Sequence, residues 1–202
     1  MAEVTVFHHA QGLTPGVRAF ADELRARGHR VHTPDLYEGH TFDTLDEGVE
    51  YMTKVGSGEL LERGVRSVDG SPAEQVYIGF SLGVLPAQKL AQTRPGARGA
   101  VFVHSCVPVS FFGTWPSRLP VRVHAMEADS MFTEEGDADA ARDLVAEVPD
   151  GELHLYPGDQ HLFADSSLSS YDADATALFL DRTLTFLHDL DTAPDTNDTH
   201  EA

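Results

Sequence analysis

A serine that lies between two glycines is the first feature of this sequence that could carry chemistry. Ser81 lies in the stretch GFSLG, residues 79–83, which fits the pattern G-x-S-x-G. A strand-forming run precedes the pattern and helix-forming residues follow it, as a nucleophile elbow requires. Such a turn strains the serine backbone and places the hydroxyl at a helix N-terminus, where developing negative charge is stabilised. The alternative is an ordinary turn between a strand and a helix, because so short a pattern also arises by chance.

A serine hydroxyl is a weak nucleophile at neutral pH, so it needs an imidazole base and a carboxylate that orients the base. In this type of site both follow the serine along the chain, the acid before the histidine, each after a later strand. Asp129 follows the run VRVHAME and His161 follows the run ELHLY, so these two residues fit the order. Glu127 and Asp159 are alternative acids, and a surface histidine is the alternative interpretation of His161.

The oxyanion formed in such a reaction needs two backbone N–H donors. Leu82, the residue after the serine, and Ala10, in the loop HHAQG after the first strand, are predicted to supply them. His8 and His9 of the same loop could instead bind a metal, but no H-x-x-x-H helix or matching Cys/His/Asp cluster accompanies them. We therefore expect neither a metal nor a cofactor.

Apolar side chains that could line a substrate pocket lie in two further loops. Phe112 and Trp115 belong to the run SFFGTWP, and Met131 follows the predicted acid. Together with His9, these three residues are the predicted substrate pocket. The alternative is that the apolar side chains only roof the core. The single cysteine, Cys106, follows a strand-like run and is expected to be a buried structural thiol.

The scaffold for these residues is predicted by a repeated alternation of strand-like and helix-like segments. Val4–Phe7 is a short apolar run, residues 14–28 carry helix start and stop signals, and RVHTPDLY is a second strand. Further strands are expected at 75–78, 99–105, 121–127 and 152–156, and helices at 82–92, 138–148 and 175–190. About six strands joined mostly by crossovers predict an α/β fold, with a mostly parallel sheet and helices on both faces.

The segment 38–70 departs from this alternation and predicts a helical cover. Two apolar periodicities suggest two helices, interrupted by GSG at 56–58. A phosphate-binding loop is an alternative for GSG, but no strand precedes it and no Lys-Ser/Thr follows it. Residues 1–190 are expected to form a single α/β domain. Residues 191–202 are acidic and lack an apolar face, which predicts a disordered tail.

Composition narrows the classes of partner. The chain has 202 residues, of which 41% are hydrophobic, and a net charge of -19. Such acidity repels phosphate backbones and anionic lipid, so we expect no nucleic-acid and no membrane partner. One cysteine allows no internal disulfide, and the start MAEVTVFHHAQG lacks the basic and apolar regions of a signal peptide. We expect a cytoplasmic monomer or homodimer that acts on a small molecule.

The chain resembles the dienelactone hydrolase family of the α/β-hydrolase superfamily. The resemblance is carried by GLTPGVRAFADELRARGHRVHTPDLYEG, IGFSLGVLPAQ, MEADSMF and YPGDQHLFAD, which together span most of the chain from Val4 to about Leu190. It implies a compact α/β-hydrolase without the extra N-terminal strands of larger members. It also implies hydrolysis of esters or lactones through a covalent acyl-enzyme, with the family's nucleophile, acid and base at Ser81, Asp129 and His161.

The chain departs from the founding members of that family at three points. They carry a cysteine where this chain has Ser81, and a glutamate where it has His9. They also bind the carboxylate of their lactone through arginines, and no arginine lies near His161 in the sequence. We therefore expect a serine mechanism and a substrate other than a muconate-type lactone. Two alternatives remain: acyl transfer, cyclisation or rearrangement with His9 as an acid–base group, or a non-catalytic binder of a small molecule or protein.

Overall fold

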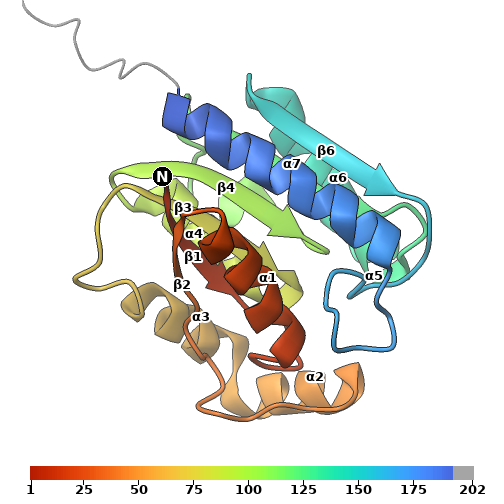
Figure 1. Cartoon of the computed structure of the whole chain (residues 1–202). Helices are drawn as coiled ribbons and strands as arrows, with labels where there is room; N and C mark the ends of the chain where they lie inside the picture. Colours follow the sequence, from red (N-terminus) through yellow and green to blue (C-terminus); the bar gives the residue numbers. More distant parts are fainter. Residues whose placement is uncertain (193–202) are drawn as a thin grey trace, which may run out of the picture.

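Six parallel strands form one sheet in this protein, whose computed structural model describes residues 1–192 (Figure 1). The strands are β1 Glu3–Phe7, β2 Arg30–His32, β3 Gln75–Phe80, β4 Ala97–Val103, β5 Val121–Met126 and β6 Gly151–Tyr156. Their order across the sheet is β2-β1-β3-β4-β5-β6, and all neighbouring strands run parallel. The expectation of an α/β fold with a parallel sheet is confirmed.

Helices cover both faces of this sheet. They are α1 Pro15–Ala26, α2 Leu45–Val55, α3 Ser57–Arg66, α4 Val84–Thr93, α5 Ser130–Glu134, α6 Asp137–Glu147 and α7 Ala173–Thr192. Figure 1 shows α1 and α7 side by side on one face, where both contribute to a core with Val76, Ile78 and Phe80 of β3. Tyr77, which points to the opposite face, belongs to the core built with α3, α4 and α6. This alternation follows from the two-residue period of a strand.

Local signals in the sequence explain where the helices near the site begin. Thr14 caps α1 by accepting a hydrogen bond from the N–H of Val17, and Pro15 occupies the first turn. Thr44 and Glu47 form a capping box at the start of α2. Gly56, at φ +94°, ends α2 and leads directly into α3. The segment 38–70 therefore contains two consecutive helices.

The C-terminal end of the predicted domain lies close to the last residue that the structure describes. The closing helix α7 extends to Thr192, two residues beyond the expected end at 190. The remainder of the predicted tail, residues 193–202, lies outside the described residues. Within residues 1–192, no helix is both long and apolar enough to cross a membrane.

The order of the strands determines where a site can form. The chain leaves β1 toward β2 on one side and returns to place β3 on the other side of β1. Ligands of open α/β sheets bind where the strand order reverses in this way, beyond the carboxyl ends of the strands. Here that point lies between the loops that follow Phe7 and Phe80.

Three of the four fully buried histidines of the core, His8, His104 and His124, have a lowered pKa. Burial is the main cause that lowers the pKa of His8 to about 4. The Nδ1–H of His8 donates to the carbonyl of His9, while Nε2 accepts from the N–H of Leu36, so a proton on Nε2 would break that bond. Burial also lowers the pKa of His104 and of His124 well below the ordinary value. All three side chains are therefore held neutral.

These histidines should make the protein sensitive to mild acid. Their contribution to stability is fully present above pH 6.5, the ordinary pKa of histidine, because both the native and the unfolded side chains are then neutral. Below that pH the unfolded chain binds protons that the native protein does not. Each buried histidine then lowers the free energy of unfolding by about 1.4 kcal/mol per pH unit. For His8 the loss ends near its native pKa of about 4.

Urea unfolding between about pH 8 and about pH 5.5, above the range in which most carboxylates titrate, measures this slope. His104→Phe should reduce the slope below pH 6.5 by about 1.4 kcal/mol per pH unit and leave the range above it unchanged. The substitution costs no hydrogen bond, since neither ring nitrogen of His104 has a partner within the described part of the chain. His188→Asn, at an exposed histidine, is the control and should leave the slope unchanged. A free energy of unfolding that stays constant over this range would contradict the prediction.

Candidate active site

Ser81 occupies a strained turn between β3 and α4. Its φ is +48°, a left-handed conformation that side chains with a Cβ rarely adopt. The two neighbouring glycines are required by the packing of the turn. A Cβ on Gly79 would lie 2.6 Å from the Cα of Val84, and one on Gly83 would lie 2.7 Å from the carbonyl oxygen of His8. The G-x-S-x-G pattern therefore allows the turn to pack tightly against the end of β1.

The structure brings Ser81, His161 and Asp129 together in one hydrogen-bonded chain. The Ser81 Oγ and His161 Nε2 atoms are 2.9 Å apart, and His161 Nδ1 lies 2.7 Å from Asp129 Oδ2. Asp129 is 1% exposed, and its other oxygen accepts from the N–H of Met131 at the start of α5. An acceptor at Nδ1 holds the imidazole proton on that nitrogen. Nε2 is then free to accept the serine proton.

The alternative acids of the sequence do not share this geometry. Glu127 and Asp159 are both exposed, and the carboxylate of Asp159 accepts from the side chain of Gln160. Among the described residues, Asp129 is the only acid within ion-pair distance of His161. Of the three carboxylates that the sequence offers, only Asp129 is therefore placed to orient His161.

The loop after β1 lies directly beside the serine turn. Phe7 pairs with Gly79 in the sheet, so Ala10 and Leu82 follow adjacent strand ends. Ala10 is 3% exposed and lies in a turn closed by a bond from the N–H of Gly12 to the carbonyl of His9. Leu82 is at the start of a helical turn, where backbone N–H groups have no partner within the helix. Both N–H groups predicted as oxyanion donors are therefore held in neighbouring turns.

The segment before α2 and the helix itself are attached to this loop. The N–H of Phe42 donates to the carbonyl of Gln11, and the Gln11 side chain donates to the carbonyl of Phe42, both at 3.0 Å. Gly48 of α2 packs so closely on Ala10 that a Cβ would overlap the Ala10 carbonyl oxygen. The hydroxyl of Tyr37 donates to the carbonyl of Gly48. The helical segment thus fixes the backbone around Ala10.

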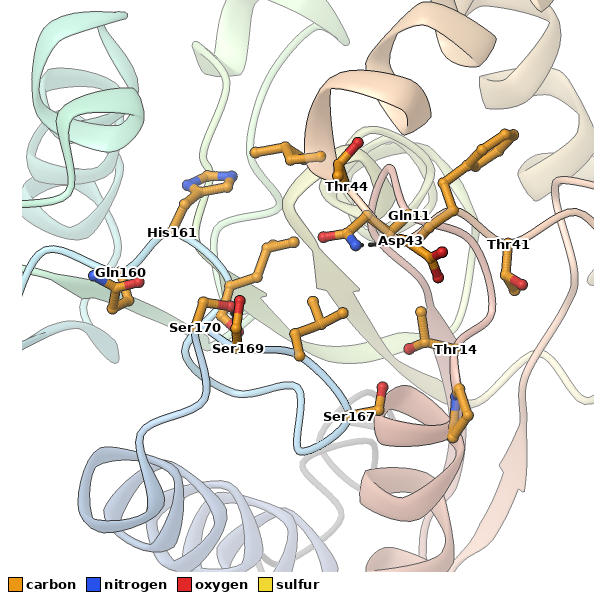
Figure 2. Close-up of a pocket in the computed structure, with 15 residues that line it drawn as sticks. Gln11, Thr14, Thr41, Asp43, Thr44, Gln160, His161, Ser167, Ser169 and Ser170 are labelled. Carbon is orange, nitrogen blue, oxygen red and sulfur yellow. Dashed lines mark hydrogen bonds between the residues drawn. The ribbon is translucent and has the colours of Figure 1, made fainter.

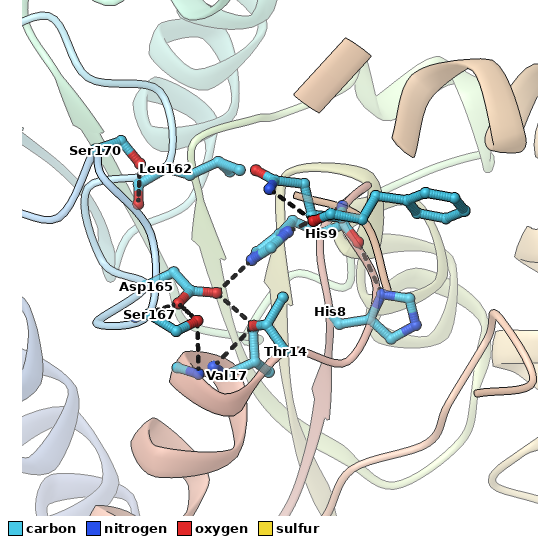
Figure 3. Close-up of polar contacts among 11 residues, drawn as sticks. His8, His9, Thr14, Val17, Leu162, Asp165, Ser167 and Ser170 are labelled. Atoms are coloured by element: carbon cyan, nitrogen blue, oxygen red, sulfur yellow. Dashed lines mark hydrogen bonds and ion pairs between the residues drawn. The ribbon is translucent and has the colours of Figure 1, made fainter. Parts of the chain in front are cut away.

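His9 was predicted to line the substrate pocket, but the structure places it in the protein interior. Its side chain is fully buried, and Nε2 lies 2.8 Å from Asp165 Oδ2 (Figure 3). Nδ1 accepts from the N–H of Gln11, so the proton is on Nε2 and points to the carboxylate. With both ring nitrogens engaged, His9 has no free atom for a substrate.

Asp165, the partner of His9, was not recognised in the sequence. Its carboxylate accepts hydrogen bonds from the hydroxyls of Thr14 and Ser167, beside the first turn of α1 (Figure 3). Burial alone would raise the pKa of Asp165, but the bonds from His9, Ser167 and Thr14 outweigh it and lower the pKa to about 2. The charged carboxylate therefore connects the loop of His9, the start of α1 and the loop that carries His161.

A cavity of about 820 Å³ opens beside His161. Figure 2 shows its polar lining, with Gln160, His161, Ser169 and Ser170 along one side and Gln11, Asp43 and Thr44 across from them. The walls come from the loop after β1, the segment before α2 and the loop after β6. The cavity therefore lies at the carboxyl edge of the sheet, next to the turn of Ser81.

The other predicted pocket residues do not line this cavity. Trp115 lines a separate cavity of about 370 Å³, packs against the ring of Phe102 and donates from its indole N–H to the carbonyl of Leu119. Phe112 ends a short helical turn in the same loop, and Met131 lies in the first turn of α5. The packing of Trp115 fits the alternative interpretation, in which the apolar side chains of this loop cover the core.

The thiol of Cys106 and a metal site are the remaining candidates for chemistry that the sequence raised. Cys106 is buried, and burial raises the pKa of its thiol, which disfavours the reactive thiolate. No group of three or more histidine, cysteine, aspartate or glutamate side chains that could hold a metal ion is found in residues 1–192.

Comparison with known proteins identifies relatives of this fold. The model of the dienelactone hydrolase family matches residues 2–190. A dienelactone hydrolase-like promiscuous phosphotriesterase from metagenomic libraries superposes with a TM-score of 0.73 at 19% identity, covering 94% of this chain and 87% of that one. A putative dienelactone hydrolase from Klebsiella pneumoniae gives 0.70 at 18% identity, covering 93% and 87%. A cold-adapted esterase from an Arctic intertidal metagenomic library gives 0.61 at 15% identity, covering 90% and 82%. No curated protein sequence matches the chain.

The network around Asp165 predicts a strong effect on stability. Asp165→Asn replaces a charged acceptor with an amide that cannot accept from His9, Thr14 and Ser167 together. We expect the free energy of unfolding at neutral pH to fall by about 3 kcal/mol, because buried donors lose their partner. Urea unfolding measures the change, with Asp159→Asn at an exposed carboxylate as the control. Equal destabilisation by the two substitutions would contradict a structural role for Asp165.

Proposed function

The chain belongs to the dienelactone hydrolase family, and from this premise we propose that it cleaves a small ester or lactone as a serine hydrolase, through an acyl-enzyme. The observation that carries the proposal is the continuous chain of hydrogen bonds from Ser81 through His161 to Asp129. Its order along the sequence and its geometry both fit a nucleophile, a base and an orienting acid.

The proposed reaction begins with attack of the Ser81 oxygen on the carbonyl carbon of the substrate. As the new C–O bond forms, Nε2 of His161 takes the hydroxyl proton, and Asp129 stabilises the imidazolium from the other side. The low exposure of Asp129 strengthens this interaction, because water screens it little. The strained turn presents the serine oxygen above the end of the sheet, as the attack requires.

The oxyanion of the tetrahedral intermediate would lie between the N–H groups of Leu82 and Ala10. When the intermediate collapses, the C–O bond to the leaving alcohol breaks, and His161 returns its proton to that alcohol. Water then enters, loses a proton to His161 and attacks the acyl carbon. The second collapse releases the acid and restores the Ser81 hydroxyl.

A transfer or rearrangement in the same site has less support. That alternative used His9 as an additional acid–base group, but both ring nitrogens of His9 are bonded within the protein and the side chain is fully buried. A substrate in the cavity would meet His161 as the base. Hydrolysis, which requires only water as the second nucleophile, is the function we propose.

Three substitutions test the roles of the triad. Ser81→Ala should lower the turnover of p-nitrophenyl acetate by about 10⁴-fold to 10⁶-fold and abolish labelling by a fluorophosphonate probe. Asp129→Asn should lower turnover by about 10⁴-fold, because the imidazole would favour the wrong tautomer. Glu127→Gln, two residues away and exposed, is the matched control and should keep wild-type turnover. Wild-type activity in Ser81→Ala would refute the proposed nucleophile, and absence of labelling in the wild type would favour a non-catalytic binder.

The contact between Gly48 and Ala10 predicts a second, more distant effect. Gly48→Ala forces α2 or the loop of Ala10 to move, since the new methyl group would overlap the Ala10 carbonyl oxygen. A displaced N–H donor stabilises the transition state less, so kcat should fall by about 10-fold to 100-fold with a smaller change in KM. Gly58→Ala in α3 is the control, because a Cβ there meets nothing within 4 Å. Unchanged kcat in Gly48→Ala would exclude Ala10 as a donor that depends on α2.

A further inference from the structure

The polar groups that line the cavity beside His161 are mostly hydrogen-bond acceptors. The serine and threonine residues among its lining are Thr14, Thr41, Thr44, Ser167, Ser169 and Ser170. A hydroxyl can donate one hydrogen bond and accept others, so its role depends on where its proton goes. The bonds within the protein decide this for most of them.

Four of these hydroxyls give their protons to the protein itself. Thr14 and Ser167 donate to the carboxylate of Asp165. Thr44 donates to Glu47 in the capping box, and Ser170 donates to the carbonyl of Leu162. Any of these oxygens that a ligand reaches can therefore only accept.

The two glutamines of the lining are oriented in the same sense. The amide nitrogen of Gln11 donates to the carbonyl of Phe42 at 3.0 Å, and that of Gln160 donates to Asp159 at 2.6 Å. Each side chain thus keeps its oxygen as an acceptor and has one N–H left to donate, so the oxygens and hydroxyls still outnumber the free donors. Asp43, which also lines the cavity, can only accept when ionised.

Positive charge does not balance these acceptors. No lysine or arginine is found among the residues that line the cavity in the described part of the chain. A carboxylate on the substrate would lose hydration without gaining a cationic partner, and it would face Asp43. A purely apolar group would displace water from the oxygens without replacing its hydrogen bonds.

We infer that the cavity binds a substrate portion that is rich in hydrogen-bond donors and carries no negative charge, such as the sugar or polyol part of an acylated carbohydrate. Hydroxyl groups supply donors to the oxygens, while the C–H faces of a sugar ring suit Leu45, Leu162 and Leu168 of the same lining. An ammonium group offers the same donor chemistry with a positive charge. The inference rests on the proposed hydrolysis at Ser81 for its readout.

A series of acetate esters that share one shape tests this inference. The four substrates are methyl 6-O-acetyl-glucoside, cyclohexylmethyl acetate, piperidin-4-ylmethyl acetate and 4-(acetoxymethyl)cyclohexane carboxylate. We expect kcat/KM for the glucoside ester to exceed that for the cyclohexyl ester by at least about tenfold, the effect of one or two hydrogen bonds. The carboxylate ester should be the poorest of the four. A kcat/KM for the piperidine ester above that for the glucoside ester would show that the donor-rich group bound in the cavity is an ammonium group.

Variants connect the preference to the cavity. Asp43→Asn should raise kcat/KM for the carboxylate ester relative to the glucoside ester by about threefold, as expected for one exposed charge. Asp46→Asn, exposed on α2 and outside the lining, should leave this ratio unchanged. A cyclohexyl or carboxylate ester hydrolysed as well as the glucoside ester would overturn the inference and leave the proposed hydrolysis intact. No turnover of any ester, with no fluorophosphonate labelling, would instead reject the proposed function itself.

Discussion

The close packing of the Ser81 turn against the end of β1 is the constraint on which the rest of the site depends. Gly83 lies against the carbonyl groups of Phe7 and His8, where no larger residue fits. This contact is possible only because β1 and β3 are neighbours in the sheet, which places the strand-order reversal at their carboxyl ends. The same contact strains Ser81 and sets the loop of Ala10 beside it. A single backbone approach therefore positions both the proposed nucleophile and one of the two proposed oxyanion donors.

Two histidine–aspartate pairs lie near this contact, and their surroundings give them different roles. His161 bonds Asp129 through Nδ1 and leaves Nε2 for the serine, at the edge of an open cavity. His9 bonds Asp165 through Nε2, but its Nδ1 is occupied by a backbone N–H and the ring is fully buried. The residue types are identical, so the number of free nitrogens and access to the cavity decide which pair can react. The buried pair connects the loops that flank the pair proposed to react.

The sequence predicted the sheet and the relative positions of Ser81, Asp129 and His161, because strand ends and chain order are local signals. It did not predict Asp165, since nothing in HLFAD indicates that this carboxylate is buried against the start of α1. The prediction of Phe112, Trp115 and Met131 as pocket residues rests on their apolar character, yet Trp115 packs against Phe102 and the cavity is lined largely by polar side chains. A loop's composition shows which side chains are apolar, but the direction in which they face depends on tertiary contacts that are distant in sequence.

The segment 38–70 connects a wall of the cavity with the proposed oxyanion donor Ala10. The residues just before α2 form one wall of the cavity, and Phe42 in that wall exchanges two hydrogen bonds with Gln11 of the loop after β1. Gly48, which has no side chain, allows α2 to pack closely against Ala10. A ligand that contacts the wall acts on the same backbone that holds the proposed oxyanion donor. In the proposed reaction, substrate contacts with this wall would therefore affect the chemical step through a few fixed peptide groups, although the wall residues do not contact the proposed triad.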